Sequence, residues 1–290
     1  MKSGWIILDK DSGLFSRTAG GKIARMIGTK KFGHIGTLDP MASGVLPIAI
    51  GDATKMIPFV EENSPAVKEY LFSLQFGFET DTLDITGTEI ARSNIVPTEE
   101  DVLAVLPKLI GKTAQIPPQY SAIHIDGKRA YDAARHGQVI EMPPRDVQIF
   151  ELEFLGTKGD SWNFRTRCST GTYVRSIGRD IAKLCRTLGT VDMIRRTLSG
   201  GFDIKSAVKL DFLENLFNNS GSIDEKLMPV DFGLGDIPVL NLSDKDADFY
   251  KNGGFVKTVA DDGCVRAYAG SSFIGIGVIT DGILRPKRTI

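Results

Sequence analysis

One aspartate of this chain lies in a segment that is dense in glycine and proline. Residues 33–47 read GHIGTLDPMASGVLP, with Asp39 near the middle. Glycine allows backbone dihedrals that other residues avoid, and proline fixes one, so such a turn can hold a carboxylate in a single orientation. A carboxylate held in this way can act as a nucleophile. The alternative is an aspartate whose side chain only caps its own turn, which is common for an isolated Asp-Pro pair.

The segment resembles a motif of the pseudouridine synthases, most closely of the bacterial tRNA pseudouridine-55 synthases (TruB family). The motif has the form G-H-x-G-x-L-D-P-x-A-x-G-x-L-P, and residues 33–47 meet every fixed position of it. Further blocks follow in the family's order and extend the resemblance over nearly the whole chain. These blocks are residues 7–10, 51–55, 68–70, 80–82, 117–122, 127–131, 171–175 and 195–196.

The resemblance implies an isomerase that converts uridine 55, in the T-loop of tRNA, to pseudouridine. The uracil is detached from its ribose, rotated and rejoined through carbon. The resemblance implies no cofactor and no metal, and the T-arm of tRNA as partner. The apolar stretch at the N-terminus is too short for a signal peptide, so we expect a cytoplasmic protein without membrane attachment. We expect a monomer because nothing in the sequence indicates an obligate oligomer. The target base has to be flipped out of folded RNA, which costs a few kcal/mol. The sequence leaves open whether Asp39 attacks the sugar or the base, or helps to remove a sugar proton.

The resemblance also assigns residues around Asp39. Arg175 is the cation expected to pair with it, because a guanidinium can hold both carboxylate oxygens and favours the charged form. Tyr70 matches a tyrosine that stacks on the target base, and Tyr173 matches a second tyrosine of the pocket. Ile194 matches an apolar contact to the base.

His34 matches a histidine that fills the space in the RNA loop after the base has left. Each assignment has an ordinary structural alternative. Arg175 could be a solvated residue on the first turn of a helix, Tyr70 and Ile194 could be core residues, and His34 could bond to its own turn.

The chain departs from the family pattern at two positions. The family has proline after the lysine that matches Lys10, whereas this chain has Asp11. A role for Lys10 is therefore in doubt. The family often has lysine before Gly-Thr-Tyr, and Thr170 stands there. One phosphate contact is therefore expected to be missing or moved.

Composition narrows the class of protein. The chain has 290 residues, of which 42% are hydrophobic, as expected for one large domain and a smaller one. No run approaches the roughly 18 apolar residues that a membrane span needs. Three widely separated cysteines and three isolated histidines indicate neither a disulfide framework nor a zinc site.

Charge is distributed unevenly along the chain. The net charge is −1. Residues 1–60 carry eight Lys and Arg against four Asp and Glu, and residues 160–196 carry eight against three. Residues 61–106 carry only two against ten. The two positive segments hold the main motifs, which favours a cationic cleft on an acidic body. The alternative is an ordinary fluctuation of charge.

The order of predicted elements favours an α+β fold with a largely antiparallel sheet. Strands are expected over residues 4–8, 69–76, 147–155 and 162–168, and helices over 16–26, 174–188 and a stretch after the capping box at 98–101. Pro107 is expected to end that last helix early. A domain boundary is expected near residue 235, with a helix from Ser243 and strands near 264–268 and 272–280 beyond it. The resemblance implies a catalytic domain over residues 1–235 and a small β-rich, PUA-like RNA-binding domain over 236–290. The alternative is a small β cap that does not contact RNA.

Three other functions are weighed against this one. A pseudouridine synthase for another RNA is disfavoured because other families of the superfamily carry Arg-Leu-Asp where this chain has Thr-Leu-Asp-Pro. A module that only binds RNA leaves Asp39 unexplained, since a carboxylate opposes phosphate binding. A glycoside hydrolase normally needs a second carboxylate about 5–10 Å away, and no second acid shares the setting of Asp39.

Overall fold

The computed structural model describes residues 2–63, 66–121, 124–125, 128–129 and 142–290. One of the three histidines, His136, lies outside the described residues. Two of the sequence blocks, 117–122 and 127–131, lie partly outside them, because Ala122, Gly127, Ala130 and Tyr131 are not described. Among the described residues, no helix has the length and apolar character needed to cross a membrane.

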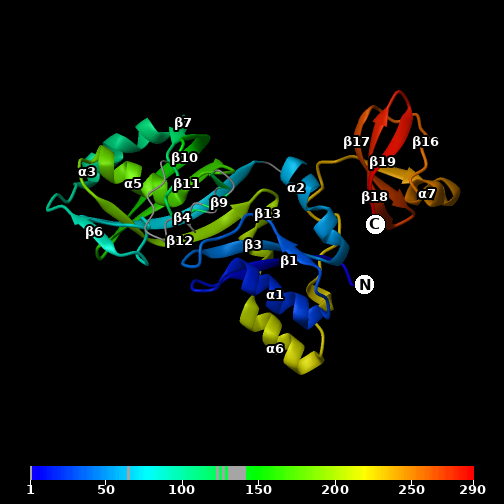
Figure 1. Cartoon of the computed structure of the whole chain (residues 1–290), viewed down its shortest axis with the longest axis horizontal. Coiled ribbons are helices and arrows are strands. Elements are labelled where there is room, and N and C mark those ends of the chain that lie inside the picture. The colour runs from blue at the N-terminus through cyan, green and yellow to red at the C-terminus, as the bar shows by residue number, and fades with distance from the viewer. Residues whose placement is uncertain (1, 64–65, 122–123, 126–127, 130–141) are drawn as a thin grey trace.

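A long mixed sheet runs through the larger part of the molecule (Figure 1). Its strands follow the spatial order β14-β1-β3-β12-β4-β11-β10-β7, with β13 beside β12 and β2 beside β3. The β1/β14 and β3/β12 pairs are parallel and the other pairs of this sheet are antiparallel. In chain order the strands are β1 (Gly4–Lys10), β2 (Phe32–His34), β3 (Ser43–Ile50), β4 (Val67–Phe76), β7 (Gly111–Gln115), β10 (Arg145–Lys158), β11 (Ser161–Ser169), β12 (Gly189–Ser199), β13 (Phe202–Asp203) and β14 (Val208–Lys209). The predicted α+β class is confirmed.

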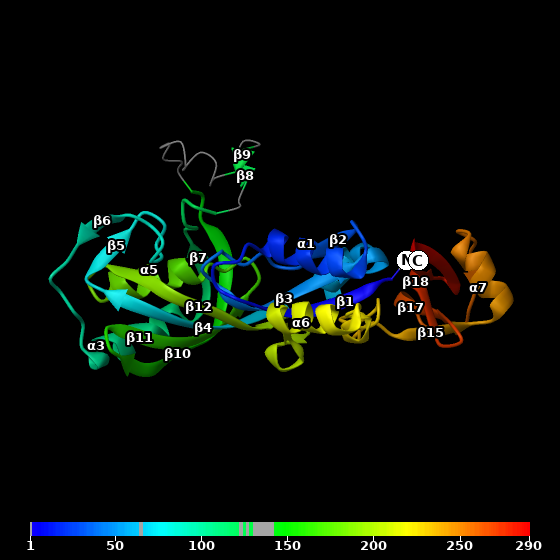
Figure 2. The same cartoon turned by 90° about the horizontal axis from the view of Figure 1, so that it is seen from below.

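Strand β1 separates two hydrophobic cores because alternate side chains of a strand point to opposite faces of the sheet. Ile6 and Leu8 join a core with helices α1 (Ser16–Ile27) and α6 (Leu210–Ser220). Trp5 and Ile7 join a second core on the other face, which includes residues of the 3₁₀ helix η1 (Gly51–Lys55) and of helix α2 (Ile57–Asn63). Figure 2 shows α1 and α6 beside this part of the sheet.

Helix α5 (Val174–Leu184) packs on strands β4 and β12 through residues such as Ile177 and Ile181. The prediction that this helix continues to Leu188 is wrong. The chain turns at Arg186, which has a left-handed φ of 59°, so that the next residues can enter β12. Leu188 therefore lies between the helix and the strand rather than on the helical stripe.

Several local predictions are confirmed. Helix α3 (Glu99–Val105) begins with a capping box between Thr98 and Asp101, and it gives way to a 3₁₀ turn, η2 (Leu106–Leu109), that contains Pro107. The predicted hairpin is formed by β10 and β11. Two further pairs of short strands lie outside the main sheet: β5 (Phe78–Thr80) with β6 (Glu89–Arg92), and β8 (His124–Ile125) with β9 (Lys128–Arg129).

The C-terminal part forms a separate, curled sheet at one end of the molecule (Figures 1 and 2). Its order is β15-β17-β18-β19-β16, and helix α7 (Asp244–Lys251) packs on it. The strands are β15 (Val239–Leu242), β16 (Val256–Lys257), β17 (Gly263–Ala269), β18 (Ser272–Thr280) and β19 (Ile283–Thr289). The expected β-rich C-terminal unit is present. Ile276 of β18 belongs to the same core as Trp5 and Val45, so the two sheets share buried contacts.

Candidate active site

Asp39 lies in the turn between β2 and β3, and the glycines of this turn make room for Arg196 of β12. The Arg196 side chain is buried; its Nη2 donates to the Gly36 carbonyl at 2.7 Å and its Nε to the Val45 carbonyl at 2.8 Å. A Cβ on Gly36, where φ is 65°, would lie 2.9 Å from Arg196 Nη1. Only glycine therefore lets the turn close over this guanidinium.

Lys10 and Ser16 hold the other side of the turn. Lys10 Nζ donates to the carbonyls of Leu14, Asp11 and Pro40 at 2.7, 2.9 and 3.3 Å. Ser16 Oγ donates to the Leu38 carbonyl and accepts from the Leu38 N–H, both at 3.0 Å. The buried Lys10 thus ties residues 11–14 to the turn even though the family's proline is absent, and burial lowers the pKa of Lys10 to about 8.

Asp39 and Arg175 form the ion pair that the sequence predicted. Arg175 Nη2 lies 2.9 Å from Asp39 Oδ2. The Arg175 side chain is 4% exposed and that of Asp39 is 40% exposed. Arg175 is therefore not the solvated helix residue of the alternative interpretation.

The two terminal nitrogens of the Arg175 guanidinium also contact the loop that follows β5 and residue 120. Its Nη1 donates to the Thr82 carbonyl and its Nη2 to the Tyr120 carbonyl, both at 2.9 Å. The buried carboxylate of Asp84 lies 3.6 Å from Nη1 and accepts bonds from Thr82 and Thr86. Arg175 thus stands between an enclosed carboxylate and the more exposed one of Asp39.

A pocket of about 190 Å³ opens beside Asp39. It is lined by five of the six predicted site residues, together with the turn and part of the loop that precedes α5: Asp39, Tyr70, Tyr173, Arg175 and Ile194 with Gly36, Thr37, Leu38, Ala42, Lys68, Gly171, Thr172 and Val174. Tyr70 and Ile194 come from the adjacent strands β4 and β12. The pocket is partly apolar, as ligand sites are.

The two tyrosines of the pocket remain neutral near pH 7. Burial raises the pKa of the Tyr70 phenol to about 12, although Arg196 opposes the shift. Burial also raises the pKa of Tyr173. Gln115 fixes the backbone at Tyr173 from strand β7: its Oε1 accepts from the Tyr173 N–H at 2.9 Å and its Nε2 donates to the Tyr173 carbonyl at 3.2 Å.

His34 lies at the start of the turn and not among the lining residues of this pocket. Its Nε2 is 2.9 Å from the Thr37 hydroxyl. Burial lowers the pKa of His34, and the nearby Arg196 and Arg17 lower it further, so the imidazole is neutral at pH 7.

Sequence reasoning missed three contributors to the site: Asp84, Gln115 and the structural role of Arg196. Asp84 and Gln115 carried no local signal, because each reaches the site from an element far away along the chain. Arg196 lay in a recognised Arg-Arg block, but only the parallel pairing of β12 with β3 reveals that it supports the turn.

Comparison with known proteins identifies the family of this chain. Residues 24–174 match the model of the TruB family pseudouridylate synthase N-terminal domain, and residues 238–290 match the model of the pseudouridine synthase II TruB C-terminal region. The chain belongs to the TruB family. Curated relatives include tRNA pseudouridine synthase B of Caulobacter vibrioides, 46% identical over 84% of this chain and 78% of the relative, and that of Ehrlichia chaffeensis, 39% identical over 98% of each. As a TruB-family enzyme, the chain is a tRNA pseudouridine synthase, an isomerase that converts uridine in tRNA to pseudouridine.

Solved structures show the same fold at lower identity. A chain of an H/ACA ribonucleoprotein bound to a substrate RNA containing 2′-deoxyuridine superposes with a TM-score of 0.71 at 21% identity, covering 99% of this chain and 84% of that one. A chain of a Cbf5-Nop10-Gar1 complex superposes with a TM-score of 0.72 at 23% identity, covering 99% and 85%. Both superpositions show that the shared fold covers nearly the whole of this chain.

Proposed function

We propose that this enzyme isomerises uridine 55 in the T-loop of tRNA, with Asp39 as the catalytic carboxylate. It acts as a cytoplasmic monomer on the T-arm. Residues 1–235 carry the catalysis and residues 236–290 grip the RNA. The observation that carries the proposal is the ion pair between Asp39 and the buried Arg175 in the wall of a pocket, in a chain of the TruB family.

The arrangement suits a carboxylate that has to stay charged under a bound base. A base that covers Asp39 removes water, which disfavours the carboxylate anion. The Arg175 guanidinium opposes this effect from within the protein, where a bound base does not displace it. Because the backbone carbonyls of Thr82 and Tyr120 also hold Arg175, the cation is already in place before the RNA binds.

The pocket supplies what a flipped uracil needs. Tyr70 and Tyr173 offer aromatic faces, each of which contributes about 1–3 kcal/mol to the binding of a base, and Ile194 provides an apolar contact. The C1′–N1 bond breaks, the base rotates, and a C5–C1′ bond forms while C5 loses its proton and N1 gains one. Attack on the ribose, attack on the base and removal of a sugar proton are all open to Asp39 in this proposal.

His34 has a different task in this proposal. It stands outside the base pocket but within the turn that carries Asp39. A neutral imidazole has a flat face and loses little hydration on burial, so His34 fills the space that the departing uracil leaves in the RNA loop.

Asp39→Asn tests the proposal because it keeps the shape of the side chain and removes the anion. We expect pseudouridine at position 55 to disappear when tRNA is incubated with this variant and mapped nucleotide by nucleotide, while tRNA binding is kept. Asp52→Asn is the matched control, since Asp52 pairs with Lys31 and Lys55 away from the pocket. Normal formation of pseudouridine 55 by Asp39→Asn would show that the proposed mechanism is wrong.

A further inference from the structure

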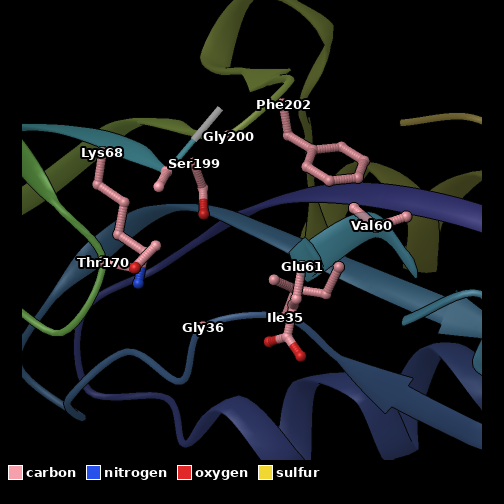
Figure 3. A pocket seen from close by; sticks show the side chains of 10 residues that line it. Ile35, Gly36, Val60, Glu61, Lys68, Thr170, Ser199, Gly200 and Phe202 are labelled. Carbon is pink, nitrogen blue, oxygen red and sulfur yellow. The ribbon is translucent and has the colours of Figure 1, made fainter. Parts of the chain in front are cut away.

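The part of the base pocket that carries Arg175 is backed by two loops that are tied to each other. Where Gly36 and Lys68 line it, the pocket adjoins a second hollow (Figure 3). Where Arg175 lines it, the Thr82 carbonyl of one loop and the Tyr120 carbonyl of another accept from the guanidinium, both at 2.9 Å. The position of Arg175 therefore depends on how these two loops are held together.

The orientation of the Arg175 guanidinium depends on its two terminal nitrogens. Its Nε is buried and has no hydrogen-bond partner among the described residues. One terminal nitrogen, Nη2, meets both the Tyr120 carbonyl and Asp39 Oδ2, each at 2.9 Å. Because a guanidinium presents its donors in one rigid plane, a shift of the Tyr120 carbonyl would also change how Nη2 faces Asp39.

The side chain of Tyr120 joins the two loops. Its hydroxyl donates to Asp81 Oδ2 at 3.2 Å, and Asp81 directly precedes Thr82. The other oxygen of the same carboxylate, Oδ1, accepts from the Thr88 N–H at 2.8 Å. A Cβ on Gly87 would lie 2.5 Å from this Oδ1, so the loop closes tightly around the carboxylate. Asp81 is thus placed by its own loop, and Tyr120 reaches it from the other one.

These hydrogen bonds form a closed ring with Arg175. The ring runs from Arg175 Nη1 to the Thr82 carbonyl, along the chain to Asp81, across to the Tyr120 hydroxyl, and from the Tyr120 carbonyl back to Arg175 Nη2. Residues 117–118 are both proline, and proline has no N–H that could bond this segment to its neighbours. The Tyr120 hydroxyl therefore supplies a tie that the backbone at these two positions cannot supply.

We propose that Tyr120 is a positioning residue of the reaction: its hydroxyl, bonded to Asp81, fixes the carbonyl that orients Arg175 toward Asp39. The inference rests on the proposed function, because it acts through the Asp39–Arg175 ion pair. Tyr120 is not among the residues that line the base pocket, so its effect on the reaction passes through Arg175. The bond to Asp81 is partly exposed and, at 3.2 Å, longer than the strongest bonds between a hydroxyl and a carboxylate. Its loss should therefore slow the reaction moderately and not abolish it.

Tyr120→Phe tests the proposal because it removes the hydroxyl and keeps the ring. We expect the single-turnover rate of pseudouridine formation, at saturating enzyme, to fall about fivefold, as for the loss of one ordinary hydrogen bond, with an unchanged Kd for tRNA. Thr187→Val is the matched control. The Thr187 hydroxyl also ties two segments together, because it donates to the Ile95 carbonyl at 2.6 Å, and Thr187 does not line the pocket. This control should lower the unfolding temperature and leave the rate unchanged. A normal rate for Tyr120→Phe, or equal losses in the two variants, would overturn the proposal.

A double-mutant cycle with Arg175→Lys separates positioning from a general loss of structure. If Tyr120 acts through the guanidinium, Tyr120→Phe should slow the enzyme about fivefold when Arg175 is present and have no further effect on the rate of Arg175→Lys. Asp81→Ala, which removes the acceptor, should likewise leave Tyr120→Phe without a further effect. Equal losses from Tyr120→Phe with arginine and with lysine at position 175 would show that the hydroxyl acts independently of Arg175, which would overturn the proposal.

The two proposals fail in different ways. Normal formation of pseudouridine 55 by Asp39→Asn contradicts the proposed function. An inactive Asp39→Asn together with a normal rate for Tyr120→Phe contradicts only the role of Tyr120.

Discussion

Gly44 and Arg196 lie side by side on the parallel strands β3 and β12, and a Cβ on Gly44 would lie 2.1 Å from the Arg196 carbonyl oxygen. This contact brings the strand that follows the Asp39 turn against the strand that carries Ile194. The distance leaves no room for any side chain at position 44. The geometry of the turn therefore depends on a glycine whose partner is about 150 residues away in the sequence.

Gly44→Ala is expected to destabilise the fold by more than the free energy that alanine needs to adopt a positive φ. Gly44 has a φ of 101° and its Cβ would meet backbone atoms that cannot move away, so we expect a loss of about 3 kcal/mol or more in the free energy of unfolding. Gly159→Ala is the matched control, because Gly159 also has a positive φ but nothing within 4 Å. Denaturant unfolding of both variants measures the difference. Equal losses would show that the close approach to Arg196 is unimportant.

Arg175→Lys is expected to reduce the rate of isomerisation by about tenfold to a hundredfold while tRNA binding is largely kept. Lysine keeps the charge but cannot reach Asp39, Thr82 and Tyr120 together, because a guanidinium presents several donors in a fixed plane and an ammonium does not. Single-turnover rates with saturating enzyme separate the chemical step from binding. The matched control is Arg179→Lys, one turn further along α5, where the arginine pairs with Asp180. A normal rate for Arg175→Lys would show that the reaction does not need the guanidinium.

Stability should depend on pH through Lys68. In the folded protein burial lowers its pKa from 10.5 to about 8. Below pH 8 the ammonium is charged in both states, so the fold carries the full cost of burying it. Between about pH 8 and 10.5 the folded protein releases this proton before the unfolded chain does, so the cost falls as pH rises. Lys68→Met should therefore be more stable than the wild type at pH 7, and the difference should shrink toward pH 10.

Thermal unfolding of the wild type and Lys68→Met across this range checks the prediction. The difference between the two proteins isolates Lys68 from Lys10, whose pKa is lowered in the same way. The charged neighbours Arg196 and Glu61 are present in both proteins. A difference that grows with pH would contradict a lowered pKa of the partly buried Lys68.

Asp231→Ala is expected to loosen the C-terminal sheet. Asp231 accepts from Arg266 Nη1 at 3.0 Å and from the Tyr268 hydroxyl, and both donors lie on β17. Loss of the carboxylate leaves the largely buried Arg266 without it, which costs about 3 kcal/mol for such a pair. We expect a lower unfolding temperature and a higher KM for tRNA, with an unchanged kcat. Asp236→Ala, at an exposed neighbouring position, is the control. Identical behaviour of the two variants would argue against the contact.

The sequence predicted those features well that depend on a few residues close together in the chain. The capping box at Thr98, the β10–β11 hairpin and the motif around Asp39 all depend on residues close together in the chain. Strand β12 was not predicted as an element, although Ile194 within it was. The strand has register shifts near Met193 and Leu198, and the charged Arg195 and Arg196 follow each other within it. Its polar and apolar residues therefore do not alternate regularly, and the sequence pattern indicates neither a strand nor a helix.

The site was predictable only as far as the resemblance reached. The Asp39–Arg175 ion pair was expected from matching motifs. Two other contacts could not be predicted, because no spacing along the chain indicates them. Asp84 reaches Arg175 from the β5–β6 loop. Gln115 reaches the backbone of Tyr173 from β7. The position of Lys68 in the wall of the pocket beside Asp39 likewise appears only when β4 lies beside the turn.

Within the part of the chain that the structure describes, the hydrogen bonds of Lys10 Nζ all go to main-chain oxygens, and every amino acid supplies such an oxygen. Side chains at residues 11–14 can therefore change while the path of these residues past the Asp39 turn is retained, so that path does not need a proline at position 11. Natural variation should be broad at these four positions and narrow at the lysine itself.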